Sequence, residues 1–300
     1  MEVKWLLEKD VFDEDLEDLY NEIDRQGMEY KTVTYRPFDL DQDFHEYFAP
    51  DECVVCYGSV NFIQRVQRNA QWIPGAFFHK SSFKCSTYYP HFMEPYGGKY
   101  RPTVLLNHKH IYLPFGSLYA AQEYLLGYGS IFSHEEGFQV KDIFIRPDLG
   151  AKSFVGQVVS EEEFNSFLES QETFVDADTM CLISRAKNIR KEYRFFISEN
   201  TILTGSLYKV DGKSVRENFE QGPVIEFLSL VLEKYSFRPD RVFVVDVAEM
   251  TKPKRPLDNL GHFKIIELNA ASCSGLYACN KRIFVEEMAR QALAEREEYF

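Results

Sequence analysis

Short apolar runs alternate with amphipathic segments in the first part of the chain. Residues 3–7 and 53–57 are mostly apolar and predict strands, and a further strand is predicted over 30–35. A helix with one apolar face is predicted between the first two, capped by Asp13, and another opens at Ser59. The β-α-β-β-α order indicates a partly parallel sheet covered by helices.

The second half of the chain has a more regular pattern. Strands are predicted over residues 104–106, 139–146, 180–184, 193–197, 201–208, 242–247 and 263–268, and helices over 117–127, from a Ser160–Glu163 capping box, over 223–235 and from Asn280. The turn at 198–200 is short enough to make the two strands around it an antiparallel hairpin. A region rich in Pro, Gly and aromatic residues, 74–102, reads as a long loop joining two domains. We therefore predict an α/β domain over residues 1–115 and an α+β domain over 116–300.

Composition and charge narrow the classes of function. The chain has 300 residues, 45% of them hydrophobic, which is enough for a sizeable core. The net charge of −13 argues against nucleic acid as a partner. No membrane span and no signal peptide are expected, and six cysteines without a disulfide framework indicate reduced thiols and a cytoplasmic location.

Some small motifs have a plain structural explanation. Cys53 and Cys56 form a C-x-x-C motif, but they lie in an apolar run and no second pair completes a zinc site, so a buried strand is favoured. His108 and His110 lie two apart on one face of an expected strand, without an evident third metal ligand. Cys273 has no suggested histidine partner and is interpreted as part of a substrate-side loop.

A short basic cluster lies between the last two predicted strands. It covers Lys252 to Arg255. Two interpretations stay open for it, a solvated loop and a contact with an acidic substrate or partner.

Oxygen-bearing side chains gather on those same two strands. Glu267 and Asn269 are two positions apart, so both side chains leave the same face of their strand. Asp246 lies within the very apolar run 242–247, where a carboxylate is costly unless it is paired or bound to metal. Asp246, Glu267 and Asn269 are therefore candidate ligands of Mg²⁺.

Positive charges occur at strand ends, or within apolar strands, ahead of these oxygens. They are Arg146, Lys152, Arg194 and Lys209. Cations placed in this way suit the phosphates of a nucleotide triphosphate. Taken singly, Arg194 could instead pair with Glu192, and Lys209 could be an ordinary surface lysine.

The ordered set of motifs resembles the ATP-grasp superfamily. More narrowly, it is similar to the divergent clade named for one Arg and two Lys, which includes phage and bacterial proteins and the eukaryotic assembly factor of translation initiation factor 2. The similarity covers about residues 140 to 285 and is carried by Phe144-Ile145-Arg146-Pro147 with Lys152-Ser153-Phe154, Glu192-Tyr193-Arg194-Phe195-Phe196, Thr204-Gly205-Ser206-Leu207-Tyr208, Val245-Asp246-Val247-Ala248-Glu249 and Ile266-Glu267-Leu268-Asn269.

The resemblance implies a fold and a set of roles. It implies an α+β ATP-grasp domain, in which two subdomains hold the nucleotide, after an α/β pre-grasp domain. The implied nucleotide-binding residues are Arg146, Lys152, Leu182, Ile183, Ser184, Arg194 and Lys209, the implied catalytic cations are Arg194 and Lys152, and the implied metal ligands are Asp246, Glu267 and Asn269. Many hinges of the superfamily carry an acidic residue for the ribose, whereas here the sequence runs Ile183-Ser184-Arg185.

The resemblance also implies a reaction. The usual chemistry is a Mg²⁺-ATP-dependent carboxylate–amine ligation through an acylphosphate, and a peptide or protein is an expected substrate of this chain. Two alternatives stay open: an assembly factor or chaperone that binds ATP without ligating, and a small-molecule kinase on the same fold.

Overall fold

The computed structural model describes residues 2–39, 41–93, 95–96, 99–100, 104–132, 139–149, 153–251 and 261–300. The chain forms two compact units. Unit 1 combines both ends of the chain, residues 1–79 and 189–300, and unit 2 is the segment 80–188 between them.

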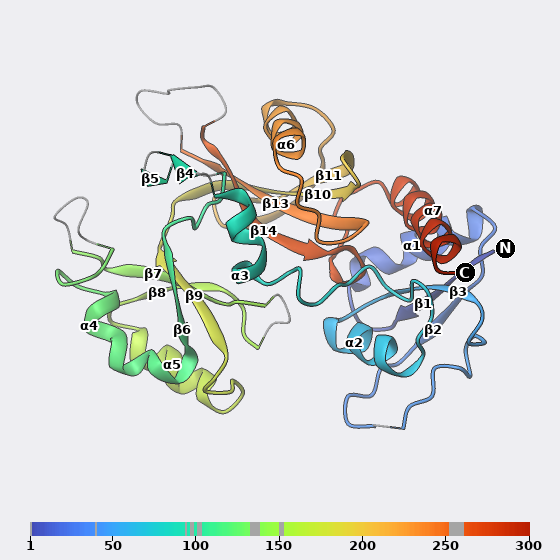
Figure 1. The fold of residues 1–300 in the computed structure, drawn as a ribbon, viewed down its shortest axis with the longest axis horizontal. Coiled ribbons are helices and arrows are strands. Elements are labelled where there is room, and N and C mark those ends of the chain that lie inside the picture. The colour runs from blue at the N-terminus through green and yellow to red at the C-terminus, as the bar shows by residue number, and fades with distance from the viewer. Residues whose placement is uncertain are drawn as a thin grey trace. The chain divides into compact units, whose positions relative to one another are not determined.

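The described residues of unit 1 form two sheets and four α-helices (Figure 1). Its strands are β1 Val3–Glu8, β2 Tyr30–Val33, β3 Cys53–Tyr57, β10 Ile189–Ser198, β11 Thr201–Val210, β12 Lys213–Asn218, β13 Val242–Met250 and β14 Phe263–Ala270; its helices are α1 Asp13–Arg25, α2 Val60–Asn69, α6 Pro223–Lys234 and α7 Lys281–Tyr299.

The smaller sheet has the order β2-β1-β3, and both strand pairs are parallel. Parallel strands need crossover connections, which α1 and the segment after β2 provide. Helix α7 lies beside α1 and packs on β1 and β3 (Figure 1). The predicted strands are confirmed, but Asp13 is the first residue of α1 rather than its cap. The N-cap is Phe12, which makes no side-chain capping bond.

The larger sheet has the order β12-β11-β10-β13-β14 and is antiparallel throughout. The predicted hairpin is confirmed as β10 and β11. Helix α6 begins at Pro223, whose fixed φ suits the first turn, and it packs near β11. Strand β12 lacks an apolar face, since most of its residues are exposed, and the hydrophobic pattern did not reveal it.

One hydrophobic core joins the two sheets of unit 1. Trp5 and Tyr57 from the parallel sheet, Phe196 and Val244 from the antiparallel sheet, and Phe284 from α7 all belong to it. Phe196 and Phe284 make an edge-on ring contact with centroids 5.1 Å apart. The core of unit 1 therefore needs side chains from the N-terminal strands as well as from the C-terminal half of the chain.

Unit 2 is built around an antiparallel sheet of order β6-β9-β7-β8. Its elements are α3 Cys85–Tyr88, β4 Pro95–Tyr96, β5 Lys99–Tyr100, β6 His110–Pro114, α4 Gln122–Leu125, β7 Asp142–Pro147, β8 Gln157–Ser160, α5 Phe164–Glu172 and β9 Met180–Arg185. Its core includes Ile143 and Ile145 of β7, Ile183 of β9, and Phe164 and Leu168 of α5.

Several predictions for unit 2 need correction. No strand forms over 104–106, and the helix predicted over 117–127 is two 3₁₀ turns followed by the short α4. Ser160 and Glu163 do bond to each other, at 2.8 Å between Oγ and Oε2, but α5 begins only at Phe164.

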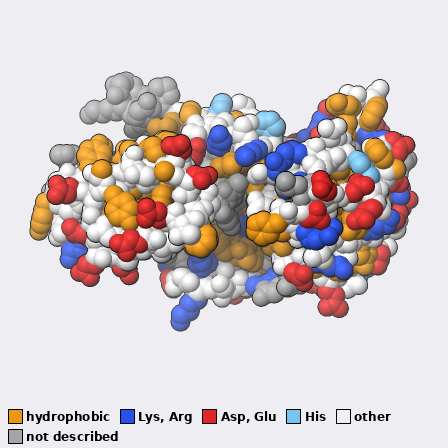
Figure 2. Space-filling model, turned by 90° about the horizontal axis from the view of Figure 1, so that it is seen from below, with side chains coloured by type: hydrophobic (Ala, Val, Ile, Leu, Met, Phe, Trp, Pro, Cys, Tyr) orange, Lys and Arg blue, Asp and Glu red, His pale blue; other side chains and the backbone are white. Residues whose placement is uncertain are grey.

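The compact units divide the chain differently from the domains predicted over 1–115 and 116–300. A compact unit of the structure need not coincide with a domain of a protein family. The domain boundary at residue 115 therefore stays a prediction. Within the described residues, no helix combines the length and hydropathy needed to cross a membrane. Acidic side chains are scattered over the face shown in Figure 2, in keeping with the net charge of −13.

Candidate functional site

The candidate site in unit 1 is a row of polar side chains that crosses the antiparallel sheet. Ser206 of β11 pairs with Arg194 of β10, Arg194 with Asp246 of β13, and Asp246 with Glu267 of β14. Side chains at paired positions leave the same face of a sheet, so the register itself brings the row together. Asn269 follows two residues after Glu267 and lies on that face as well.

Arg194 and Asp246 form a buried bidentate ion pair. Nε of Arg194 donates to Oδ1 at 2.9 Å, and Nη2 donates to Oδ2 at 2.8 Å. Asp246 is 1% exposed and the side chain of Arg194 is 11% exposed. Arg194 therefore does not pair with Glu192. The fork of the guanidinium matches the carboxylate, which is the arrangement that makes such a pair specific.

Asn269 lies between the two carboxylates. Its Nδ2 donates to Oδ2 of Asp246 at 3.1 Å and to Oε1 of Glu267 at 2.9 Å. The row thus brings two carboxylates together at one amide, and a 180° turn of that amide would present its oxygen there instead. Two carboxylates and an amide oxygen are the donor set that a hard cation such as Mg²⁺ takes. The three predicted metal ligands converge, and their chemistry fits the ion.

This donor set is too small to enclose a metal by itself. Across the part of the chain that the structure describes, no three His, Cys, Asp or Glu side chains are grouped so as to hold a metal ion. Mg²⁺ usually keeps several waters and binds through one or two carboxylates together with substrate phosphates. The site therefore suits an ion that arrives with a phosphate-bearing ligand.

Burial sets the electrostatics of the row. It raises the pKa of Asp246, the guanidinium of Arg194 opposes that rise, and the negative charge of Glu267 adds to it. Additional positive charge would therefore stabilise the site, because a cation would reduce the repulsion between the carboxylates of Asp246 and Glu267.

Two tyrosines flank the guanidinium of Arg194. Its Cζ lies 5.6 Å from the ring centroid of Tyr208 and 5.1 Å from that of Tyr277, and the two rings are stacked at 5.0 Å. Burial raises the pKa of Tyr208, which stays protonated and donates to Oε2 of Glu192 at 2.7 Å. Lys209 pairs with the other oxygen of Glu192 at 3.2 Å. Lys209 therefore lies near the row of polar side chains and is ion-paired with Glu192.

The sequence patterns gave Tyr208 and Tyr277 no role at the site, and they identified the segment after β14 only as a substrate-side loop around Cys273. Gly275 accepts a hydrogen bond from Nη1 of Arg194 at 3.1 Å through its carbonyl. The parallel sheet holds the same turn, since the hydroxyl of Tyr57 donates to the carbonyl of Ser274 at 2.7 Å. The run of small residues over 270–275 is the one sequence signal of this close approach.

The other predicted nucleotide-binding residues belong to unit 2, apart from Lys152, which lies outside the described residues. Arg146 lies near the end of β7 and is 7% exposed. Leu182, Ile183 and Ser184 lie in β9, the strand between β6 and β7, and are fully buried. Oγ of Ser184 donates to Oδ1 of Asn107 at 3.0 Å. Their roles toward a nucleotide stay predictions.

The structure supports the buried-strand interpretation of Cys53 and Cys56 and corrects the placement of the two histidines. Cys53 and Cys56 are buried in β3, and all six cysteines are free. His110 begins β6 while His108 precedes it, so the two do not share a strand face. Burial raises the pKa of Cys273, which disfavours a nucleophilic thiolate. The cluster from Lys252 to Arg255 lies outside the described residues.

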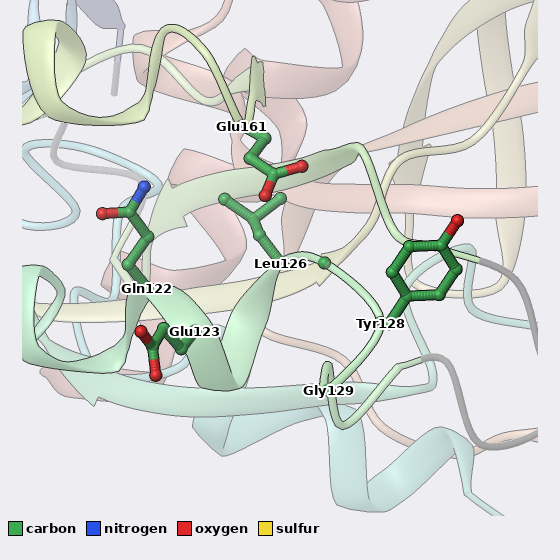
Figure 3. Close-up of a pocket in the computed structure, with 7 residues that line it drawn as sticks. Gln122, Glu123, Leu126, Tyr128, Gly129 and Glu161 are labelled. Atoms are coloured by element: carbon green, nitrogen blue, oxygen red, sulfur yellow. The ribbon is translucent and has the colours of Figure 1, made fainter.

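A pocket in unit 2 is lined by Gln122, Glu123, Leu126, Gly127, Tyr128, Gly129 and Glu161 (Figure 3). Glu123 and Glu161 are carboxylates, and none of the described lining residues has a basic side chain. Two negative charges repel a triphosphate, so this pocket is unsuited to a nucleotide.

Comparisons with known proteins agree with this architecture. The model for an ATP-grasp domain, family 2 of the clade named for one Arg and two Lys, matches residues 129–286. Among solved structures, D-cycloserine synthetase DcsG aligns with a TM-score of 0.59 at 10% identity, covering 97% of this chain and 99% of that one. D-alanine–D-alanine ligase from Bacillus anthracis in complex with ATP aligns at 0.59 and 14% identity, covering 100% of both chains.

A third similar structure is a RiPP-associated ATP-grasp ligase from Chryseobacterium gregarium, in complex with ADP and a leader and core peptide. It aligns with a TM-score of 0.52 at 9% identity, covering 98% of this chain and 97% of that one. At these identities, the structural similarity establishes the ATP-grasp fold. A search of curated protein sequences found no significant match.

Proposed function

Since this chain belongs to family 2 of the ATP-grasp clade named for one Arg and two Lys, we propose that it is an ATP-dependent carboxylate–amine ligase that works through an acylphosphate. The observation that carries the proposal is the convergence of Asp246, Glu267 and Asn269 beside the buried guanidinium of Arg194. A peptide or protein is among the substrates we propose. The solved RiPP-associated ligase, whose structure contains a peptide, shares the fold.

The three oxygen-bearing side chains would hold Mg²⁺. When bound, the ion offsets the negative charge on the phosphates of ATP. Asp246 is held in place by both nitrogens of the guanidinium fork, so its carboxylate cannot rotate away. Preorganisation of this kind means that little reorganisation is needed when the nucleotide binds.

Arg194 contributes to the site in two ways. Three of its N–H groups are used by Asp246 and by the carbonyl of Gly275. A guanidinium has five N–H groups, so two are left that can donate to a phosphate oxygen. Arg194 thus orients Asp246 and keeps donors for the nucleotide. Lys209, Arg146 and Lys152 are proposed as further phosphate contacts, and residues 182–184 as the adenine-side hinge.

The proposed reaction has two steps. A substrate carboxylate oxygen attacks the γ-phosphorus of ATP, and the bond from that phosphorus to the β–γ bridging oxygen breaks, which gives an acylphosphate and ADP. An amine nitrogen then attacks the acyl carbon and loses a proton, and inorganic phosphate leaves. Both steps transfer groups between substrates, so the protein supplies binding, orientation and charge rather than a nucleophile.

Nucleotide binding by matched variants tests the site. We expect Asp246→Asn and Glu267→Gln each to weaken Mg²⁺-dependent binding of a non-hydrolysable ATP analogue by about tenfold or more, as for a lost charge contact. Glu249→Gln is the matched control, because Glu249 lies on the same strand but bonds to Tyr193 and Arg190 instead. Titration calorimetry with and without Mg²⁺ measures the effect. Equal affinities in all four proteins would contradict the assignment.

Product analysis separates the proposed ligase from its alternatives. A ligase releases ADP and phosphate only when an acid and an amine are both present. A stable phosphorylated product would identify a small-molecule kinase. Tight Mg²⁺-dependent nucleotide binding without any ADP, across a panel of acids and amines, would favour a nucleotide-binding assembly factor.

A further inference from the structure

The carboxylate of Asp15, in helix α1, reaches the turn that follows β14. Its Oδ2 accepts hydrogen bonds from the backbone N–H of Leu276 at 2.9 Å and of Tyr277 at 3.2 Å. Asp15 is 4% exposed. A buried carboxylate needs partners, and here two of them are backbone groups more than 260 residues away in the sequence.

Two cations bind the carbonyl of the same residue, Tyr277. Nζ of Lys281 donates to the carbonyl of Tyr277 at 2.6 Å, and Nη2 of Arg216 donates to it at 3.3 Å. Both cations also pair with Oδ1 of Asp15, at 3.4 Å for Lys281 and 2.5 Å for Arg216. Asp15, Arg216 and Lys281 therefore form a closed charged clamp around the backbone of Tyr277.

The clamp holds a backbone conformation that tyrosine seldom adopts. The φ of Tyr277 is 49°, in the left-handed region that glycine favours. A residue with a side chain pays about 1 kcal/mol or more there, so the surrounding contacts must maintain it. The N–H and the carbonyl of Tyr277 are both fixed by the clamp, and the direction of its ring follows from them.

That ring lies against the candidate site. Tyr277 stacks on Tyr208 at an angle of 8° between the rings, and its centroid is 5.1 Å from Cζ of Arg194. The carbonyl of Gly275, in the same turn, accepts from Arg194. The turn thus contacts the guanidinium through an aromatic face and a hydrogen bond, while Asp246 holds its other side.

We propose that Asp15 is a positioning residue that acts through Tyr277 to fix the guanidinium of Arg194 beside Asp246. It makes no contact with Arg194 or Asp246 among the described hydrogen bonds and ion pairs. The expected effect of Asp15 on the position of the Arg194 guanidinium does not depend on the proposed function, whereas its expected effect on nucleotide affinity rests on that function.

The direct readout is the ¹⁵Nε–Hε resonance of Arg194, assigned from the spectrum of Arg194→Lys. A buried Nε–H that donates to a carboxylate exchanges slowly with solvent and should give a distinct signal. We expect Asp15→Ala to shift or broaden this resonance. Asp18→Asn, an exposed carboxylate on the same helix, is the matched control and should leave it unchanged.

A second pair of variants tests whether the effect passes through Tyr277. In the background Tyr277→Leu, where the ring is missing, Asp15→Ala should change the Arg194 resonance much less than it does in the parent protein. Asp15→Asn keeps an acceptor oxygen for the turn while removing the charge. It serves where Asp15→Ala fails to fold, and it should produce a smaller shift in the same direction.

Binding of the ATP analogue is measured on the same proteins. We expect Asp15→Ala to weaken it by about fivefold and Asp18→Asn to leave it unchanged. An unchanged Arg194 resonance in folded Asp15→Ala and Asp15→Asn overturns the positioning role. If the parent protein binds no analogue, the proposed function fails, and the resonance alone decides the role of Asp15.

Discussion

Asp240, in the loop between α6 and β13, shows how a single carboxylate can make stability depend on pH. Its Oδ2 accepts from the backbone N–H of His79 at 3.1 Å, and its Oδ1 accepts from the N–H of Arg241 at 2.8 Å. Burial raises its pKa to about 7, although both hydrogen bonds oppose the rise. At a pH between about 4 and 7, the folded protein therefore keeps a proton on Asp240, whereas the unfolded chain has lost it.

The pH dependence of unfolding should carry this signature. Since the folded pKa of Asp240 exceeds the unfolded value of about 3.9, its stabilising contribution is complete below about pH 4 and is lost as the pH rises through 7. We expect Asp240→Asn to reduce the fall in unfolding free energy between pH 5 and pH 8 by about 2 kcal/mol. Urea denaturation across this range measures it.

The matched control is Asp41→Asn, which alters an exposed carboxylate and should keep the pH slope of the parent. The slope is more informative than the absolute stability, because asparagine has one acceptor oxygen for the two backbone groups that Asp240 serves. Parallel curves for Asp240→Asn and the parent would show that this carboxylate does not hold the extra proton.

Strands β10 and β11 pair closely at one glycine. A Cβ built on Gly205 would lie 2.4 Å from two ring carbons of Phe195 and 2.8 Å from the carbonyl oxygen of Phe219. Phe195 is fully buried, so its ring has nowhere to move. The absence of a side chain at Gly205 lets the ring lie flat across the hairpin.

We expect Gly205→Ala to lower the unfolding free energy by about 1–3 kcal/mol, as other overpacked cores do. Gly129→Ala is the control, since a Cβ there meets no atom closer than 3.7 Å and its backbone needs no left-handed conformation. Denaturation midpoints at constant m-value measure both. A stability equal to that of the parent would mean that the hairpin can widen at this point.

The elements that could be predicted from sequence are those whose side chains report burial. Strand β3 is a continuous apolar run and was predicted with its observed bounds. Strand β13 is mostly apolar and was predicted over 242–247, within its observed bounds, and α2, whose apolar residues have helical spacing, was predicted to open at Ser59, its observed N-cap. Strand β12 is mostly exposed and gave no signal. Helix 117–127 was overestimated, because apolar spacing does not reveal where a chain breaks into 3₁₀ turns.

The residues of the candidate site likewise fall into those that a local sequence pattern predicts and those that it does not. Glu267 and Asn269 could be grouped because they are two apart on one strand, and Asp246 because a carboxylate in an apolar strand needs a partner. That partner, Arg194, comes from the strand register, and the contact of Asp15 with Tyr277 joins distant segments. Neither has a local pattern that a sequence could display.

On the scale of the whole molecule, the two compact units have different relations to the chain. Unit 2 is one continuous segment with a hydrophobic core of its own. Unit 1 is discontinuous, and its core needs Trp5 and Tyr57 from the start of the chain together with Phe196, Val244 and Phe284 from beyond unit 2. Only the continuous unit can therefore be expected to fold as a fragment.

We expect a fragment of residues 80–188 to unfold in urea as one cooperative transition and to give a dispersed amide spectrum. A fragment of residues 1–79 is the control and should remain largely unfolded, because the α7 and β13 side chains that cover its strands are missing. A molten 80–188 fragment would show that the core of unit 2 is insufficient by itself.

The discontinuous core of unit 1 also sets an order of events on the ribosome. Trp5 and Leu7 emerge long before their partners in α7, Phe284 and Met288, because most of the sequence lies between them. At about 5–20 residues per second, strand β1 stays without these partners for roughly 15–60 s. Any shortening that removes α7 would leave that strand permanently uncovered, and we expect chaperones to bind it.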